Sequence, residues 1–319
     1  MRVLITGITG FAGRHLAAYL SKKKGVRIFG TGHGVRRTSR ITAVRGAQIF
    51  PCDIRDRSSV RRVVEKTRPE CIFHLAAQAS VPRSWELPAE TFKTNVLGTL
   101  NLFEEVKRLK TRPRIHIAGS AQEYGDPGRS PVAEDGRLRP GSPYAVSKIA
   151  QELLSYQYDA SAGIPVVRTR AFNHTGPGQT REYVVSALAF QIAEIEAGLR
   201  DPEVALGNLD SVRDFTDVRD VVRAYWLALE KGVPGEVYNV CSGVGRRIGD
   251  IVDYYSGRAR VKFRVKKNTR QFRDHDTPVL LGRADKLRRR TGWRPQISFH
   301  TTLDEVLDHW RRNVQATSR

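Results

Sequence analysis

The chain of 319 residues fits two domains, or one large α/β domain with an appended part. Apolar residues make up 40% of it, enough for a sizeable core, and no apolar run approaches the roughly 20 residues of a membrane-spanning helix. The formal net charge of +21 is high for an enzyme, so nucleic acid and small anionic ligands are both open as binding partners.

The positive charge is scattered along the chain and is densest at residues 257–273. In the middle of this segment basic residues alternate with Ala259, Val261, Phe263 and Val265. A period of two predicts a strand with one basic, solvated face. We interpret it as a solvated edge strand, which leaves a nucleic-acid surface as the less favoured interpretation.

The N-terminal "MRVLITG" becomes glycine-rich after five residues, which is too short for a signal-peptide core and predicts a first strand. Cys52, Cys71 and Cys241 are far apart and lack metal-ligand spacing. They predict reduced thiols, a cytoplasmic protein and no metal site.

Short apolar segments alternate with helical periodicity over the first 170 residues. Six of them read as strands, at 2–7, 27–32, 47–53, 71–77, 114–120 and 165–173. This pattern predicts a Rossmann-type, doubly wound parallel sheet of the α/β class, with helices on both faces.

After about residue 175 the predicted elements become less regular, with glycine and proline between them. We expect a cofactor-binding domain over 1–170 with return segments near 207–245, and a smaller interwoven substrate domain over 171–319. The last helix is predicted to start with a capping box of Thr302 and Glu305. Its apolar stripe is predicted to be core, at Leu303, Val306, Leu307, Trp310 and Val314.

A glycine-rich loop follows the first strand. Gly7, Gly10 and Gly13 stand between this strand and a predicted helix. Glycines permit a tight turn and close approach of the backbone, and the helix N-terminus offers free amides to a pyrophosphate. The loop therefore predicts dinucleotide binding.

The end of the second strand indicates which dinucleotide binds. An acid normally stands here to bind the ribose diol of NAD, but no Asp or Glu occurs between Phe29 and Phe50. His33, Arg36 and Arg37 are available instead, and cations suit the 2′-phosphate of NADP. We therefore expect NADP(H), with NAD(H) as second choice; an ordinary basic surface loop is the alternative.

A helix predicted to start at Ser142 and Pro143 carries Tyr144 and Lys148, four residues apart on one face. A free tyrosine has a pKa near ~10 and is a poor acid at neutral pH. A lysine ammonium one turn away should stabilise the phenolate and lower that pKa. The pair predicts proton exchange with a carbonyl or alcohol while a nicotinamide exchanges hydride.

In combination these motifs resemble the extended short-chain dehydrogenase/reductase superfamily, whose members act on nucleotide sugars. The resemblance covers nearly the whole chain. It rests on GxxGxxG at 7–13, "CDI" at 52–54, "HLAA" at 74–77, "NVLGT" at 95–99, the serine loop at 119–125 and YxxxK at 144–148.

Two later segments, "RAFNHTGPGQ" at 170–179 and "LGNLDSVRDFTDVRD" at 206–220, resemble the GDP-mannose branch of that superfamily. Within the branch, "VYNVCSG" at 237–243 and "TGWRP" at 291–295 are more similar to its reductases than to its dehydratases. A GDP-sugar is therefore the expected substrate.

The resemblance and the two loops together give the expected site. Catalysis is assigned to Ser120, Tyr144 and Lys148. Cofactor contacts are assigned to Gly7, Thr9, Gly10, Phe11, Ala12, Gly13, His33, Arg36, Arg37, Asp53, Ile54, Leu75, Ala76, Ala77, Asn95, Tyr144 and Lys148. Substrate contacts are assigned to Ser80, Ser84, Gln122, Asn173, Gly207, Asn208, Arg213, Arg273 and Asp276. Arg213 could instead pair with Asp214 or Asp217.

By this resemblance we expect an NADPH-dependent reductase that converts GDP-4-keto-6-deoxy-D-mannose to GDP-D-rhamnose. The alternatives are a nucleotide-sugar 4-epimerase, a GDP-mannose 4,6-dehydratase and an NADP-binding sensor with a basic surface. Family likeness also implies a homodimer or homotetramer built on helices near 95–110 and 143–160.

The residue at position 122 separates the reductase from the dehydratase. In the dehydratases the matching residue is a glutamate that takes a proton from the sugar, and a glutamine amide cannot do this. An extended backbone through the loop would point Ser120 and Gln122 toward the site, and Ala121 and Glu123 away from it.

Overall fold

The computed structural model describes residues 1–34, 46–267 and 277–317. These residues contain a seven-stranded parallel sheet with the order β10-β6-β5-β4-β1-β2-β3. Its strands are β1 (Arg2–Thr6), β2 (Arg27–Gly32), β3 (Ala47–Pro51), β4 (Cys71–His74), β5 (Arg114–Ser120), β6 (Val166–Ala171) and β10 (Val237–Val240). All six predicted strands lie in this sheet, so the predicted α/β class and parallel sheet are confirmed.

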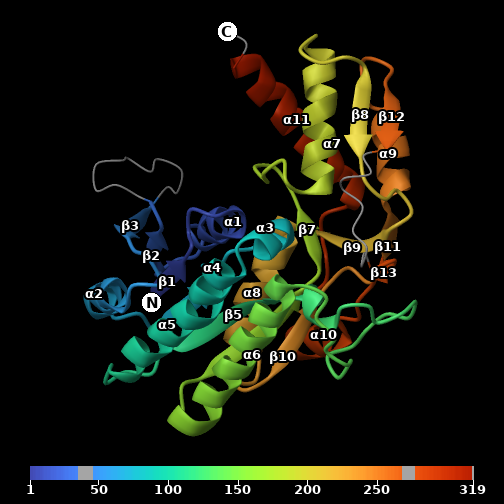
Figure 1. Cartoon of the computed structure of the whole chain (residues 1–319). Coiled ribbons are helices and arrows are strands. Elements are labelled where there is room, and N and C mark those ends of the chain that lie inside the picture. Colours follow the sequence, from blue (N-terminus) through green and yellow to red (C-terminus); the bar gives the residue numbers. More distant parts are fainter. Residues whose placement is uncertain (35–45, 268–276, 318–319) are drawn as a thin grey trace.

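Helices cover both faces of the sheet (Figure 1). Alternation along β1 explains why, because Val3 and Ile5 belong to one buried apolar cluster and Leu4 belongs to another. The first cluster includes side chains of α1 (Phe11–Leu20) and α8 (Val218–Lys231). The second includes side chains of α2 (Arg57–Thr67), α5 (Gly98–Lys107) and α6 (Pro143–Ala162).

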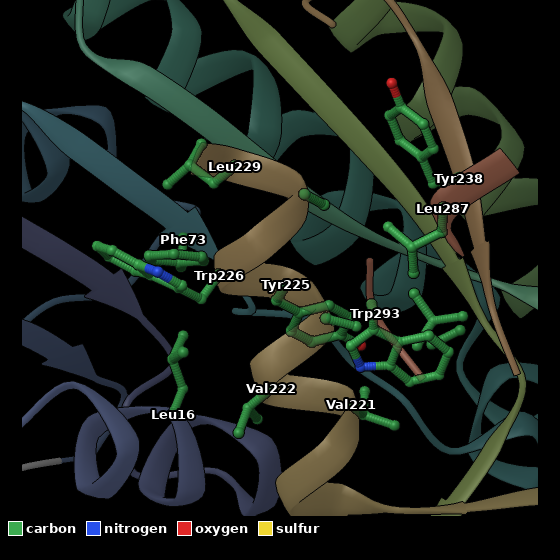
Figure 2. Close-up of a cluster of buried hydrophobic side chains, with 14 of the residues drawn as sticks. Leu16, Phe73, Val221, Val222, Tyr225, Trp226, Leu229, Tyr238, Leu287 and Trp293 are labelled. Atoms are coloured by element: carbon green, nitrogen blue, oxygen red, sulfur yellow. The ribbon is translucent and has the colours of Figure 1, made fainter. Parts of the chain in front are cut away.

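Helix α8 supplies much of the first cluster. Figure 2 shows its buried side chains beside residues of the sheet and of neighbouring helices. The labelled side chains are Val221, Val222, Tyr225, Trp226 and Leu229 of α8, together with Leu16, Phe73, Tyr238, Leu287 and Trp293. Trp293 is fully buried, and its indole N–H donates to the Asp220 carbonyl at 2.9 Å. The C-terminal part of the chain thus helps to cover the main sheet.

Short helices connect the strands on the side of α5 and α6. They are α3 (Val81–Glu86), α4 (Pro88–Phe92), the π-helical turn η1 (Lys93–Leu97) and the 3₁₀ turn η2 (Ala121–Tyr124). The start of α6 is as predicted, since Ser142 accepts from the Ala145 N–H and Pro143 occupies the first helical position.

A third apolar cluster lies among elements after residue 184. The helices after residue 184, apart from α8, are α7 (Val184–Glu196), α9 (Ile248–Ser256), α10 (Asp285–Thr291) and α11 (Phe299–Thr317). The strands outside the main sheet are β7 (Asn173–Thr175), β8 (Glu203–Leu206), β9 (Val212–Asp217), β11 (Gly245–Arg247), β12 (Arg264–Lys267) and β13 (Val279–Leu280). The cluster is formed by residues 185–195, 204–215, 248–255 and 303–307, and the helices α7, α9 and α11 that carry many of them lie in the upper part of Figure 1. The exact domain boundaries remain a prediction.

The predicted start of the last helix is wrong. Helix α11 begins at Phe299, three residues before the predicted cap, because Ser298 accepts from the Thr301 N–H. Thr302 is instead buried and donates to the Asp217 carboxylate at 2.7 Å. The predicted apolar stripe of this helix does lie in the core.

The basic segment forms a solvated edge strand, as predicted, over part of its length. Among its described residues Arg264–Lys267 forms the strand, which pairs with β8. Ala259 and Phe263 pack against the third apolar cluster, whereas Val261 and Val265 are exposed. Ion pairs from Arg264 and Lys266 to Glu203 hold this strand on its neighbour.

No helix in the described ranges is long and apolar enough to cross a membrane. All three cysteines fall within those ranges, and each is a free thiol.

Candidate active site

The loop between β1 and α1 fits a dinucleotide pyrophosphate. Gly7 has a φ of +71°, and a Cβ on it would stand 2.9 Å from the Ala76 backbone. A Cβ on Gly13 would stand 2.8 Å from Ile8 Cα, so the helix and the turn after β1 approach too closely for any side chain there. Gly10 begins the helix without a side-chain cap and is exposed, which leaves the first amides available to an anion.

The other residues assigned to the cofactor here are partly accessible. Thr9, Phe11 and Ala12 are all half-buried. The Phe11 ring stacks on His174 at 6.1 Å between centroids and so joins the loop to the segment after β6.

The predicted adenosine end lies beside β2 and β3. His33 is exposed, and its Nδ1 is 3.6 Å from the Asp53 carboxylate. Asp53 is also paired with the Arg55 guanidinium at 2.7 Å, and this hydrogen bond lowers its pKa. Ile54 is largely buried in the second apolar cluster. Arg36 and Arg37 lie outside the described residues.

The end of β4 lies next to the glycine loop. Leu75, Ala76 and Ala77 are half-buried there, and Thr6 Oγ1 accepts the N–H groups of Leu75 and Ala76 at 3.2 Å each. The predicted cofactor-lining segment is thus held against the first strand.

Asn95 is fully buried and bonded to protein on both sides of its amide. Its oxygen accepts from the Gln78 N–H, and its nitrogen donates to the Gln78 carbonyl and to Ser147 Oγ. We therefore expect Asn95 to position the loop after β4 and helix α6 rather than contact the cofactor with its amide.

The serine loop is a tight turn, so the extended backbone predicted for it is wrong. Ser120 ends β5 and caps the 3₁₀ turn η2 in a capping box with Glu123. The Glu123 side chain turns back to accept the Ser120 N–H at 2.7 Å and is fully buried, while Gln122 is half-buried. The sequence S-A-Q-E could have signalled this turn.

Tyr144 stands at the first turn of α6, near enough to the Ser120 side chain for that hydroxyl to act on the Tyr144 pKa. Burial raises its pKa, and the Ser120 hydroxyl opposes that shift. The predicted lowering by Lys148 is therefore not seen, because burial dominates and the ammonium is directed elsewhere. Tyr144 is a neutral phenol at neutral pH.

Lys148 lies one turn further along α6 and is buried. Its Nζ donates to the Ala118 carbonyl at 2.7 Å and to Gln151 Oε1 at 2.6 Å. Gln151 Nε2 in turn donates to Thr99 Oγ1 at 2.7 Å. Burial lowers the pKa of Lys148. Ser120, Tyr144 and Lys148 are thus brought together where β5 ends.

Two of the predicted substrate residues near β4 serve the local structure. Ser80 caps α3 by accepting from the Arg83 N–H, and its own N–H donates to Gln78 Oε1. Ser84 is fully buried and donates to the Val81 carbonyl at 2.6 Å, so its hydroxyl does not face an open site.

Four further residues predicted to contact the substrate lie on β7, on β9 and in the loop between β8 and β9. Asn173 is half-buried and pairs with Phe215, two residues beyond Arg213 on β9. Gly207 and Asn208 are also half-buried. Arg273 and Asp276 lie outside the described residues.

The two carboxylates considered as partners of Arg213 have other ligands. Asp214 accepts from the Ser242 N–H, the Ser242 hydroxyl and the Gly243 N–H. Asp217 accepts from Arg219 and Thr302. Arg213 itself donates to the Val212 carbonyl at 3.0 Å and to the Pro278 carbonyl at 3.4 Å. Its contact with a substrate phosphate stays a prediction.

Sequence reasoning missed two residues of this region. Gln151 is three residues after Lys148, a spacing that brings side chains together on a helix and could have been recognised. Glu123 was assigned to the face away from the site, and its contact with the Ser120 backbone was missed with the turn.

Comparison with known proteins agrees with this arrangement. A family model described as GDP-mannose 4,6 dehydratase matches residues 4–306. The GDP-6-deoxy-D-mannose reductase of Pseudomonas aeruginosa is 32% identical over 98% of this chain and 98% of its own.

Two solved structures extend the comparison. RMD from Pseudomonas aeruginosa, complexed with NADPH, is similar with a TM-score of 0.85 and 31% identity, over 98% of this chain and 100% of that chain. UDP-glucose 4-epimerase from Thermus thermophilus, complexed with NAD, has a TM-score of 0.86 and 31% identity, over 98% and 99%. The chain therefore belongs to the GDP-mannose 4,6 dehydratase family, within the extended short-chain dehydrogenase/reductase enzymes.

Proposed function

We propose that this protein is an NADPH-dependent reductase that converts GDP-4-keto-6-deoxy-D-mannose to GDP-D-rhamnose. The observation that carries the proposal is the serine loop. The Ser120 side chain lies beside Tyr144, the half-buried position 122 holds a neutral glutamine, and the acid of the loop is fully buried. Tyr144 can donate a proton to a ketone, whereas the turn η2 presents no base that could remove a proton from the sugar.

Each residue has a defined part in the reduction. When bound, NADPH supplies the hydride that adds to the C4 carbonyl carbon. Tyr144 gives its phenolic proton to the carbonyl oxygen, and the Ser120 hydroxyl hydrogen-bonds that oxygen. The raised pKa of Tyr144 keeps it protonated before this step. Lys148 presents a buried ammonium beside the pair and is held by Ala118 and Gln151.

Two observations support NADPH as the cofactor. The glycine loop fits a pyrophosphate. Strand β2 is followed by the exposed His33 and, in the sequence, by Arg36 and Arg37, without the acid that binds a ribose diol. The similar Pseudomonas aeruginosa RMD was solved with NADPH.

The direct test uses enzymatically made GDP-4-keto-6-deoxy-D-mannose with NADPH, followed by cofactor oxidation and product identification. Oxidation of NADPH with formation of GDP-D-rhamnose supports the proposal. A 4-epimerase is the second candidate, favoured by the similarity to an NAD-bound epimerase. Conversion of a hexose nucleotide with tightly held NAD, and no net NADPH oxidation, would establish the epimerase instead.

A dehydratase and a sensor would each be recognised by a separate result. A dehydratase would remove water from GDP-mannose in the presence of NADP⁺, which mass spectrometry detects. A sensor would bind duplex DNA selectively at physiological salt, whereas attraction of DNA to a merely basic surface falls steeply with salt.

We further propose that the chain forms a homodimer or homotetramer in the cytoplasm. Free thiols support that compartment. Large apolar side chains are exposed from α3 to η1 and along α6, as helices that pair between subunits require. They are Trp85, Leu87, Phe92, Leu97, Val146, Leu153 and Tyr156. Light scattering of the purified chain tests the assembly.

A further inference from the structure

A buried carboxyl group lies directly behind the catalytic pair. Glu123 is fully buried, and its Oε1 accepts the Ser120 N–H at 2.7 Å. Gly119 leaves room for it, because a Cβ there would stand 2.8 Å from this oxygen and 2.6 Å from the Thr169 carbonyl. The strand before the turn is thus shaped to admit the carboxyl group.

The second oxygen of Glu123 is not satisfied as an acceptor. Oε2 is buried and has no hydrogen-bond partner among the described residues. The nearest cation is Arg170, whose Nε lies 3.4 Å away. That guanidinium is already bound twice by Glu152, at 2.6 and 2.9 Å. Arg168 is a second buried guanidinium of this cluster, and it too pairs with Glu152, at 3.5 Å. A second carboxylate would therefore be buried beside a guanidinium whose shortest bonds go to another anion.

The groups around Glu123 come from several elements. They are Tyr124 on its own turn, Arg170 on β6, Tyr144, Lys148 and Glu152 on α6, and Arg139, whose backbone N–H donates to the Glu123 carbonyl. Burial raises the pKa of Glu123, and the neighbouring Glu152 carboxylate raises it further. A proton on Oε2 would turn this unpartnered acceptor into a donor toward Glu152.

We propose that Glu123 is a neutral carboxylic acid at neutral pH, donates its proton toward Glu152, and is a positioning residue that holds the Ser120 backbone behind Tyr144. Its neutrality also matters for the proton donor, since an anion there would oppose loss of the Tyr144 proton. This consequence for turnover rests on the proposed function, whereas the protonation of Glu123 does not.

Infrared difference spectroscopy tests the protonation without substrate. At neutral pH the wild-type protein should show the carbonyl band of a protonated carboxylic acid, and Glu123→Gln should remove it. Glu65→Gln, at an exposed position, is the matched control and should leave the band in place. Absence of such a band, or its survival in Glu123→Gln, would overturn the proposal.

A second measurement uses the unmodified chain in case the variant does not fold. With carbon-13 in the glutamate carboxyl groups, one NMR resonance should titrate well above the others. Titration of every glutamate at acidic pH would refute the neutral acid.

Turnover tests the positioning role. Glu123→Leu removes the acceptor for the Ser120 N–H, and kcat should fall about fivefold with little change in the KM for NADPH. Glu123→Gln retains an acceptor and a donor and should restore most of that loss. Equal losses in both variants would contradict positioning by a neutral acid. If wild-type protein reduces no 4-keto sugar nucleotide, the proposed function fails while the infrared result still stands.

Discussion

Replacing Gln151 by leucine should slow the reaction without removing any residue proposed to touch the substrate. The side chain is 1% exposed and provides one of the two protein acceptors found for Lys148 Nζ. Leucine is close to glutamine in volume, so packing on α6 should largely survive. The substitution leaves an ammonium donor unpaired in a buried site and takes a donor from Thr99.

The size of the effect follows from the lost bond. A hydrogen bond to a charged group contributes about 1.5–3 kcal/mol, and each ~1.4 kcal/mol corresponds to tenfold in rate. If this bond is needed to hold Lys148 in the reactive arrangement, kcat should fall by about 10- to 150-fold. The free energy of unfolding should fall by about 1–3 kcal/mol.

The assay is steady-state reduction of GDP-4-keto-6-deoxy-D-mannose, with chemical denaturation as a check on folding. Gln157→Leu is the control, because Gln157 is exposed on the same helix and bonds only Ser161 among the described residues. Gln157→Leu should change the free energy of unfolding by no more than about 0.5 kcal/mol and should leave kcat nearly unchanged. A folded Gln151→Leu protein with wild-type kcat would refute the reasoning that Gln151 holds the lysine.

Three further predictions concern the same site. Tyr144→Phe should abolish most turnover and leave NADP(H) binding nearly intact, because only the proton donor is lost. Lys148→Ala should weaken both turnover and NADP(H) binding. Steady-state kinetics with cofactor titration measures both, and wild-type-like turnover in Tyr144→Phe would contradict its role as the proton donor. NADPH should be used at lower concentration than NADH, and alanine at both Arg36 and Arg37 should narrow the gap; a preference for NADH would contradict the NADP assignment. Because burial lowers the pKa of Lys148 below 10.5, its ammonium is lost at a lower pH than in free lysine, so turnover should fall as pH rises through that pKa. The pH–rate profile measures this, and denaturation should show stability rising over the same interval, since the unfolded chain binds more protons there.

Six strands of the main sheet were predictable because each of them reads as a short apolar run with turn residues around it. The order of the strands, and the seventh strand β10, depend on contacts between distant segments and leave no local pattern. The basic segment was predicted correctly in kind but not in extent. Its period-two alternation predicted a strand from Arg258 onward, and among its described residues only Arg264–Lys267 pairs with a neighbour. Alternation alone does not supply a partner strand.

A combination of motifs predicted that Ser120, Tyr144 and Lys148 would come together, whereas it did not predict their electrostatic environment. The spacing of Tyr144 and Lys148 suggested a lysine that lowers the tyrosine pKa. In the structure the ammonium is held by Ala118 and Gln151, and burial decides the pKa of Tyr144. Desolvation depends on every segment packed over a site, so local spacing cannot give its magnitude or its sign.

The last prediction tests the reductase assignment at positions 122 and 123. The 3₁₀ turn leaves Gln122 half-buried and buries Glu123. A carboxyl group at position 122 would therefore have a different environment from the one at position 123. Wild-type protein with GDP-mannose and NADP⁺ should not form the 4-keto-6-deoxy product. Gln122→Glu places a base at the position that is glutamate in the dehydratases, and general base catalysis contributes about 10²–10⁴-fold. We expect a measurable loss of water by mass spectrometry in this variant. Dehydration by the wild-type protein would show that another residue is the base, and a Gln122→Glu variant that still reduces but never dehydrates would show that position 122 does not separate the two reactions.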